Sequence, residues 1–337
     1  MASTSVGVGA PPLEQTLRRV PARPTIRGHI QIARIDHWFK NVFVLPGIVF
    51  AVASDPSHVP DGLWWRILVG LFATCLVASS NYVINEVLDA PFDQFHPIKH
   101  TRPVPSGQVS IPLAYVEWIL LMLVGVGLGL TISLPFAITL GVLWLMGCVY
   151  NIPPIRSKDL PYIDVLSESI NNPLRMLAGW FIASTSSVAP ASLLLSYWMV
   201  GCFFMATKRY AEYREIGDPV RAAAYRKSLG FYTLDRLLVS IMFYASAAML
   251  FLGAFIMRYR MELILAFPLV AAVMAIYLAL SFKDHSAAQR PEGLYREPLL
   301  MAAVVSCTLV MVMLMFVNIP AMQTWFAPTA PTIFDRP

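Results

Sequence analysis

Charge is scarce in this sequence of 337 residues. Asp, Glu, Lys and Arg together make up 13% of the chain, about half the share of an ordinary soluble domain. Hydrophobic residues make up 57%, and the mean hydropathy is +0.62. Apolar runs of about 18–20 residues recur, which is the length that crosses a bilayer core of about 30 Å. The composition excludes a soluble globular protein and predicts an integral membrane protein made of helices.

The sequence also lacks the patterns of several common sites. It contains no glycine-rich phosphate loop, no zinc-ligand spacing and no arrangement typical of a nucleophilic triad. Its four cysteines lie inside apolar segments without short-range pairing, as small buried side chains do, and so favour neither a disulfide set nor a metal site; they are Cys75, Cys148, Cys202 and Cys307. Any reactive site must therefore be built from the few charged residues.

The apolar runs define the expected architecture. We expect nine membrane-spanning helices, at residues 41–56, 64–88, 111–132, 134–150, 163–186, 190–212, 234–257, 261–281 and 298–318. The fold class is therefore all-α, an integral membrane bundle of about nine transmembrane helices. Residues 29–320 would form this domain, residues 1–28 a disordered cytoplasmic tail, and residues 321–337 a C-terminal tail on the other side.

The distribution of basic residues predicts how this bundle is oriented. Twelve Lys and Arg residues fall before the first span or in the loop at residues 207–233, and cytoplasmic loops are the ones that carry such an excess; they are Arg18, Arg19, Arg23, Arg27, Arg34, Lys40, Lys208, Arg209, Arg214, Arg221, Arg226 and Lys227. The N-terminus is thus expected in the cytoplasm and the C-terminus outside. The loops at residues 89–110, 151–162, 207–233 and 282–297 would then share the cytoplasmic face of an inner membrane.

The fifth expected span is too polar to face lipid. It carries Asp164, Glu168, Asn171, Asn172 and Arg175. Ionisable groups within a membrane normally face the interior of a bundle or a water-filled cavity, so we expect this segment to line such a space.

The stretch NEVLDAPFD, residues 85–93, carries the most distinctive chemistry, and we call it the aspartate motif. Asn85, Asp89 and Asp93 are four residues apart and fall within one stripe of a helix. Such oxygen ligands suit Mg²⁺, which takes one or two carboxylates and completes its shell with water and substrate phosphates. Pro91 is expected to break or kink the helix and leave Asp93 on a mobile end. The plain alternative is a solvated helix end with scattered acids.

A basic cluster follows the aspartate motif within ten residues. It contains His96, Lys99, His100 and Arg102. A metal-bound diphosphate needs cations on its remaining oxygens, and the planar arginine side chain matches them in a two-pronged way. Acids for Mg²⁺ followed by bases for phosphate indicate one diphosphate site. For the two histidines, a role there and a solvated surface position are both open.

These residues resemble a known family. NEVLDAPFDQFHPIKHTRPVPSG is similar to the aspartate-rich motif of the UbiA superfamily of intramembrane prenyltransferases, Asn-Asp-x-x-Asp-x-x-x-Asp before Arg-Pro, with Glu86 in place of the first aspartate. YNIPPIRSKD, residues 150–159, is similar to the second cytoplasmic loop of that family. The resemblance implies nine helices around a central lipid-accessible cavity, with Mg²⁺ bridging a diphosphate to the carboxylates.

The family's second paired-aspartate motif is replaced here. Lys208 and Glu212 stand where carboxylates are expected, which favours fewer metals and more direct phosphate contacts. Three short stretches, RIDHWFKNVFV, TKRYAEY and YRKSLGFYT, resemble the branch of decaprenyl-phosphate phosphoribosyltransferases, which serves the synthesis of arabinose donors for the cell wall. That branch transfers 5-phosphoribose from phosphoribosyl diphosphate to a polyprenyl phosphate.

The resemblance and the charge pattern together assign expected roles. Mg²⁺ is the expected cofactor, with Asn85, Asp89 and Asp93 as ligands. The expected catalytic residues are Asp89, Asp93, Lys208 and Glu212, with Asp164 as another carboxylate that could stabilise positive charge on ribose C1. The expected substrate-binding residues are Lys40, Asn41, Lys99, Arg102, Tyr150, Arg156, Lys158, Arg175, Arg209, Arg226 and Lys227.

Two other functions remain open at this point. One is a prenyltransferase that moves a polyprenyl group from its diphosphate onto an aromatic or quinone-precursor acceptor, with the same Mg²⁺ site. The other is a lipid-phosphate transporter, although the inverted repeats common in transporters are not visible as a second aspartate motif. We expect the bilayer, the polyprenyl phosphate and phosphoribosyl diphosphate as partners, and no nucleic acid; the sequence leaves the oligomeric state undetermined.

Overall fold

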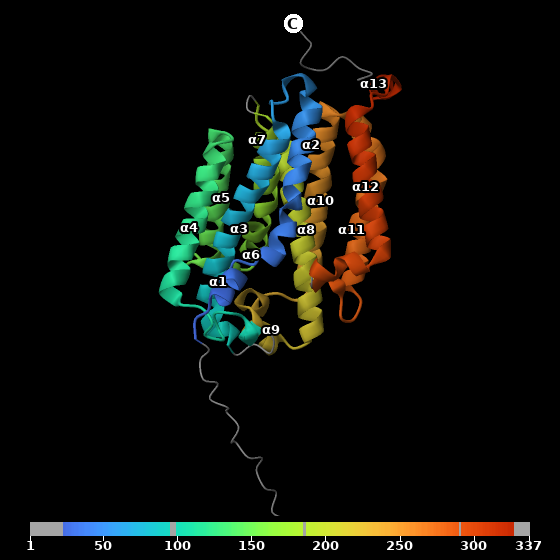
Figure 1. Cartoon of the computed structure of the whole chain (residues 1–337). Helices are drawn as coiled ribbons and strands as arrows, with labels where there is room; N and C mark the ends of the chain where they lie inside the picture. The colour runs from blue at the N-terminus through green and yellow to red at the C-terminus, as the bar shows by residue number, and fades with distance from the viewer. Residues whose placement is uncertain (1–22, 95–98, 185–186, 290, 327–337) are drawn as a thin grey trace, which may run out of the picture.

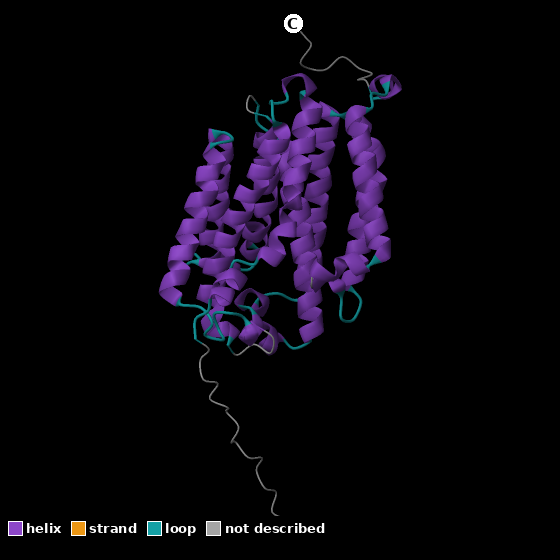
Figure 2. Ribbon diagram, in the orientation of Figure 1, coloured by secondary structure: helices purple, strands orange, loops and turns teal. Residues whose placement is uncertain are grey.

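The computed structural model describes residues 23–94, 99–184, 187–289 and 291–326. Within these ranges all regular structure is helical and no strand occurs, as Figure 2 shows. His96, the tail at residues 1–22 and the chain beyond residue 326 lie outside the described residues.

Thirteen α-helices follow one another along the described chain (Figure 1). Their bounds are α1 Ile26–Ile32, α2 Leu45–Ser54, α3 Leu63–Asp93, α4 Ile111–Leu130, α5 Leu134–Asn151, α6 Ile163–Ser169, α7 Asn171–Ala183, α8 Ala191–Ile216, α9 Pro219–Tyr225, α10 Leu234–Tyr259, α11 Phe267–Ser281, α12 Pro298–Phe316 and α13 Pro320–Trp325. Eight short 3₁₀ segments connect them, of which η1 (Ile35–Val44), η3 (Lys99–Thr101), η4 (Ser157–Asp159) and η5 (Lys227–Gly230) matter for the site.

The lengths and composition of the helices agree with the predicted membrane bundle. Among the described residues, eight segments are long and apolar enough to cross a membrane, and each matches one of the expected spans. The remaining expected span is the polar one, which the structure divides into α6 and α7. Residues 163–183 would extend about 31 Å as a helix, enough to cross the bilayer core. The chain is thus a multi-pass membrane protein.

The outward faces of the bundle are apolar, as lipid contact requires. On α4 the only buried side chains or backbone positions are Ala114, Gly125 and Gly129, and large residues such as Leu120 and Leu123 are more than half exposed. The core forms two main clusters, one centred on α2, α3, α5 and α7 and the other on α8, α10 and α11.

Helices α2 and α7 approach each other closely in the first cluster. A Cβ at Gly47 would overlap the carbonyl of Met176, and a Cβ at Gly179 would overlap the carbonyl of Val44. Two glycines, one from each helix, therefore allow backbone contact inside the membrane. This contact fixes the position of α7, the helix that carries Arg175.

The predicted polar loops meet at one end of the bundle. Lys158 after α5 reaches Asp89 at the end of α3, and Lys227 in η5 reaches Asp159 in η4. Helix α1 docks on the loop after α3, where Thr25 donates its N–H to the Gln108 carbonyl. Figure 1 shows α9 at this end and α13 at the opposite end.

Of the two alternatives expected at Pro91, a break and a kink, the break is wrong. Helix α3 does not break at Pro91 but continues to Asp93, whose side chain is 7% exposed. Asp93 is held by ion pairs with Arg102 and Lys99, and these contacts with the following loop compensate for the backbone hydrogen bond that proline cannot make.

Candidate active site

Asp89 lies on the last turns of α3 and contacts two cations. Lys158 Nζ donates to Asp89 Oδ1 at 2.6 Å, and an Arg156 terminal nitrogen donates to the same oxygen at 2.9 Å. Arg156 adopts a left-handed backbone with φ of 34°, a conformation that costs about 1–2 kcal/mol for an L-residue. The strain is offset because its side chain joins Asp89 to Asp159.

Burial shapes the charge on Lys158. Its side chain is 7% exposed, and this burial lowers the pKa of Lys158 to about 8 even though the Asp89 carboxylate raises it. Burial likewise lowers the pKa of Lys99, with Asp93 opposing the change. An anion that bound beside either amine would stabilise the charged form of that amine and raise its pKa.

Asp93, four residues further along α3, has its own pair of cations. An Arg102 terminal nitrogen lies 2.6 Å from Asp93 Oδ2, and Lys99 Nζ lies 3.8 Å from Asp93 Oδ1. With Asp89, Asp159, Arg156, Lys158 and Lys227 these residues form what we call the Asp89 cluster, in which three carboxylates meet five cations. The structure therefore brings together the acids and bases that the sequence assigned to one site, with cations in excess.

Asn151 is a member of this site that the sequence analysis missed. Its side-chain oxygen accepts hydrogen bonds from Asn85 at 2.5 Å and from Lys158 at 3.0 Å, while its amide donates to the Gly147 carbonyl. It is 3% exposed and orients one expected metal ligand and one cation together. The clue in the sequence was the position of Asn151 next to Tyr150, at the end of an expected span.

The aspartate motif fits Mg²⁺ only together with a substrate. No group of three or more His, Cys, Asp or Glu side chains in the described ranges could hold a metal ion. Asn85, Asp89 and Asp93 supply an amide and two carboxylates, which matches the preference of Mg²⁺ for few protein ligands and additional phosphate oxygens. The surrounding cations are suited to the rest of a diphosphate.

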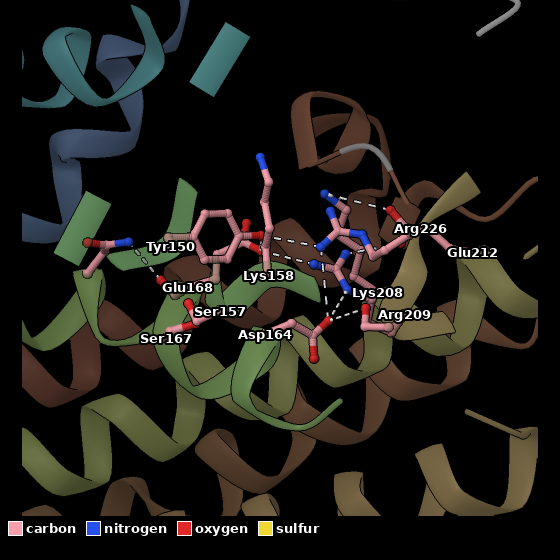
Figure 3. A network of polar contacts seen from close by, with 12 residues as sticks. Tyr150, Ser157, Lys158, Asp164, Ser167, Glu168, Lys208, Arg209, Glu212 and Arg226 are labelled. Carbon is pink, nitrogen blue, oxygen red and sulfur yellow. Dashed lines mark hydrogen bonds and ion pairs between the residues drawn. The ribbon is translucent and has the colours of Figure 1, made fainter. Parts of the chain in front are cut away.

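Arg209 on α8 presents the reverse arrangement, a base surrounded by acids (Figure 3). Its three nitrogens contact Asp164 at 3.2 Å, Glu168 at 2.9 Å and Glu212 at 3.0 Å. With Lys208 and Arg226 these residues form what we call the Arg209 cluster. Because Arg209 is 1% exposed and every nitrogen is occupied, its geometry does not fit the expected direct contact with phosphate. It acts instead as an internal support.

Asp164 is equally enclosed. Tyr232 donates its hydroxyl to Asp164 Oδ1 at 2.7 Å, and Ser228 donates to Oδ2 at 3.0 Å. The Tyr232 hydroxyl also accepts the Tyr162 N–H. Asp164 has no exposed surface, so its stabilisation of charge on C1 would act at a distance, and this role stays a prediction. Ser228 and Tyr232 were missed by the sequence analysis, since neither stands in a charged pattern.

Lys208 lies at the more open edge of the Arg209 cluster, beside the buried Glu212. Their ion pair is long, 4.0 Å, and Lys208 is 24% exposed at the side chain. In Figure 3 the Lys208 amine is drawn in the same network as Arg226, which contacts the Tyr150 hydroxyl at 3.3 Å. Tyr150 in turn donates to Glu168 at 2.8 Å. These groups connect the α5 end of the site to α8.

Glu86, which replaces the family's first aspartate, contacts the loop after α3 and the N-terminal segment. Its Oε1 accepts the Val104 N–H at 3.1 Å, and its Oε2 lies 3.9 Å from Arg34 Nε. It is 2% exposed. Since Val104 follows Arg102 by two residues, Glu86 anchors the loop that carries the cations of Asp93.

The remaining expected residues belong to η1 and α7 and to neither of the two clusters. Lys40 approaches His37 at 3.3 Å. Asn41 is buried, donates to Cys75 Sγ at 3.1 Å and accepts from Arg175 Nε at 3.0 Å. Arg175 is therefore placed by Asn41 rather than by a carboxylate.

Comparison with known proteins gives the family. The model of the UbiA prenyltransferase family matches residues 42–304. A UbiA homolog from Archaeoglobus fulgidus, solved with DMAPP and Mg²⁺ bound, superposes with a TM-score of 0.64 at 18% identity, over 86% of this chain and 100% of that one. The chain belongs to the UbiA prenyltransferase family, which places it among membrane-embedded transferases.

Two curated relatives are more specific. The decaprenyl-phosphate phosphoribosyltransferases of Corynebacterium glutamicum and Mycolicibacterium smegmatis are 30% and 28% identical over 66% and 63% of this chain. The matched region spans 64% and 65% of the length of those two proteins, just under two thirds.

Proposed function

We propose that this protein transfers 5-phosphoribose from phosphoribosyl diphosphate to a polyprenyl phosphate, in an Mg²⁺-dependent reaction that releases diphosphate. The observation that carries the proposal is the excess of cations in the Asp89 cluster. A prenyl diphosphate presents one anionic group, whereas phosphoribosyl diphosphate presents two and the acceptor lipid a third. The named relatives support the same reaction.

The aspartate motif would hold the metal. Asn85, Asp89 and Asp93 would bind Mg²⁺, which when bound neutralises charge on the diphosphate leaving group. Arg102 and Lys99 would turn from Asp93 to the free diphosphate oxygens as the carboxylate takes up the metal. Lys158 and Arg156 would do the same from Asp89.

The transfer itself needs no strong base, because the acceptor phosphate is already an anion. One of its oxygens would form a bond to ribose C1 as the bond from C1 to the diphosphate oxygen breaks, and both electrons of that bond leave with the diphosphate. Positive charge develops on C1 in such a transition state. Glu212, which is buried beside Lys208, would stabilise this charge electrostatically, and Lys208 would bind an oxygen of the leaving diphosphate.

The charge distribution also supports an orientation. The cationic end of the bundle would face the cytoplasm of a cell with an inner membrane, with the N-terminus on that side and the C-terminus outside. Phosphoribosyl diphosphate, which is soluble, would enter from the same side.

A donor-choice assay tests the reaction. Purified protein in detergent with Mg²⁺ receives labelled phosphoribosyl diphosphate with a polyprenyl phosphate, or a labelled polyprenyl diphosphate with a hydroxybenzoate acceptor. We expect label in lipid only in the first mixture, and its loss with EDTA. Prenylated aromatic product only in the second mixture would replace the proposal with the prenyltransferase alternative.

A further inference from the structure

Arg175 differs from the other basic residues near the site. It lies twelve residues after the start of α6, about 18 Å along a helix that rises about 1.5 Å per residue and so near the middle of a bilayer core of about 30 Å. Its one hydrogen bond within the described chain is to the neutral Asn41, at 3.0 Å. No carboxylate of the described residues forms an ion pair with it, whereas the cations of the Asp89 and Arg209 clusters all have acidic partners.

The position of Arg175 is built rather than incidental. Asn41 is 3% exposed and uses its amide on Cys75 while its oxygen holds Arg175 Nε. The backbone contact between α2 and α7 includes Met176, the next residue, so the helix cannot shift to withdraw the charge. The two terminal nitrogens of Arg175 are left for another partner.

The side chains around Arg175 are mainly polar and neutral, and Glu168, two turns earlier, is paired with Arg209 instead. Tyr82 on α3 and Tyr197 on α8 lie within electrostatic range of its guanidinium. Asn171 lies one turn earlier on the same face of α7, and its side-chain oxygen is buried without a hydrogen-bond partner in the described structure. An arginine is costly in the membrane interior unless it pairs with an anion or lines a wet cavity, and no carboxylate of the described residues is paired with Arg175.

We propose that Arg175 binds the phosphate monoester of the acceptor lipid inside the membrane, at a loading position from which the phosphate moves to ribose C1 at the Asp89 site for the transfer. The inference rests on the proposed function and assigns its second substrate to a residue. The planar guanidinium fits two phosphate oxygens. The donor's 5-phosphate has the same chemistry, but it reaches the protein from water, where the Asp89 cluster lies; an anion attached to a long hydrocarbon chain is the one that the bilayer itself delivers to this depth.

Binding measurements on purified protein in detergent test this assignment. Polyprenyl phosphate, phosphoribosyl diphosphate with Mg²⁺, and hydroxybenzoate are titrated separately into the wild type, Arg175→Gln and Arg175→Lys. We expect Arg175→Gln to weaken polyprenyl phosphate binding about tenfold or more, a loss of about 1.4 kcal/mol, and to leave phosphoribosyl diphosphate within about twofold. Arg175→Lys should recover part of the loss, because lysine keeps the positive charge but lacks the two parallel donors of the guanidinium.

Arg236→Gln is the matched control. Arg236 is an exposed arginine of α10 that donates to the Phe231 carbonyl, so its loss should change neither affinity. In turnover, Arg175→Gln should raise the KM for the lipid while the KM for phosphoribosyl diphosphate stays constant. If Arg175→Gln lowers thermal stability so far that it cannot be assayed, the Arg175→Lys protein gives the same comparison.

The outcomes separate this inference from the proposed function. Loss of polyprenyl phosphate binding in Arg175→Gln supports the inference even if the wild type fails to bind or transfer phosphoribose, a result that would sink the proposed function alone. Unchanged lipid binding overturns it. A loss confined to phosphoribosyl diphosphate would assign Arg175 to the 5-phosphate, and a loss confined to hydroxybenzoate would assign it to an aromatic acceptor; either overturns the lipid assignment.

Discussion

The Asp89 cluster and the Arg209 cluster contain the same kinds of side chain in opposite arrangements. In the first, acids on α3 are surrounded by bases, five cations meet three carboxylates, and Asp89 is 22% exposed. In the second, a base on α8 is surrounded by acids, three cations meet three carboxylates, and Arg209 is 1% exposed. The Asp89 cluster has an excess of positive charge that can bind an anion, whereas the Arg209 cluster has equal numbers of positive and negative groups.

This difference distinguishes the cluster that can bind a ligand from the cluster that supports the packing of the helices. Desolvating an arginine is tolerated only when its charge is fully compensated, and Arg209 meets that condition without any substrate. The Asp89 cluster meets it only when further negative charge arrives. The excess of cations, rather than the number of charged residues, therefore identifies the part of the site that we assign to phosphate.

The largest effect is expected from breaking the balanced cluster. Arg209→Ala would leave Asp164, Glu168 and Glu212 buried without their common partner, and removing one member of a buried ion pair costs about 3–5 kcal/mol. Thermal unfolding in detergent, followed by the loss of monomeric protein in size exclusion, measures this change. If the Arg209→Ala protein were as stable as the wild type and had only lost substrate affinity, Arg209 would be a ligand-binding residue after all.

The next effect comes from the acids of the cation-rich cluster. Asp89→Asn should reduce turnover about 100-fold or more, equal to about 2.7 kcal/mol in the barrier, because it removes a negative metal ligand. The required Mg²⁺ concentration should rise in the same protein. Asp159→Asn is the control, since Asp159 contacts Arg156 and Lys227 in the same cluster but is no expected metal ligand; equal losses in both variants would argue against metal binding at Asp89.

Lys208→Ala sharpens the comparison within one helix. Lys208 neighbours Arg209 in sequence, yet its contact with Glu212 is long and partly exposed, so its removal should change stability by less than about 1 kcal/mol. We expect turnover to fall about tenfold, equal to about 1.4 kcal/mol, because a phosphate contact is lost. Unfolding temperature and kcat measured on the same sample distinguish the two effects, and a destabilised but fully active protein would contradict this role.

The smallest and most discriminating effects are expected at Glu86. If Glu86 anchors the loop through the Val104 N–H, Glu86→Gln keeps both the length and the acceptor and should stay within about twofold of wild type. Glu86→Asp restores the family's residue but shortens the side chain, and losing one hydrogen bond costs about 0.5–1.5 kcal/mol, so the KM for phosphoribosyl diphosphate should rise. The opposite order, with aspartate active and glutamine inactive, would make Glu86 a metal ligand.

Much of the fold was predictable because its causes are local. A helix satisfies its own backbone within the membrane, so the nine expected spans correspond to eight apolar segments and the divided α6–α7 pair. The failure at Pro91 is instructive. Proline weakens a helix locally, but the ion pairs from Asp93 to Arg102 and Lys99 come from the next loop, which no local rule includes.

The order of residues shows which side chains could do chemistry: the aspartate motif, the bases after it, and the polar fifth span with Arg175. The role of each one depends on how the helices pack. Adjacent residues on α8 differ by about 100° around the helix axis, which buries Arg209 among three acids and leaves Lys208 at the edge of the site. Charges interact according to distance and solvent exposure, and the partners of Arg209 include residues 41 and 45 positions away in the chain, so the division between support and binding arises only when the helices pack.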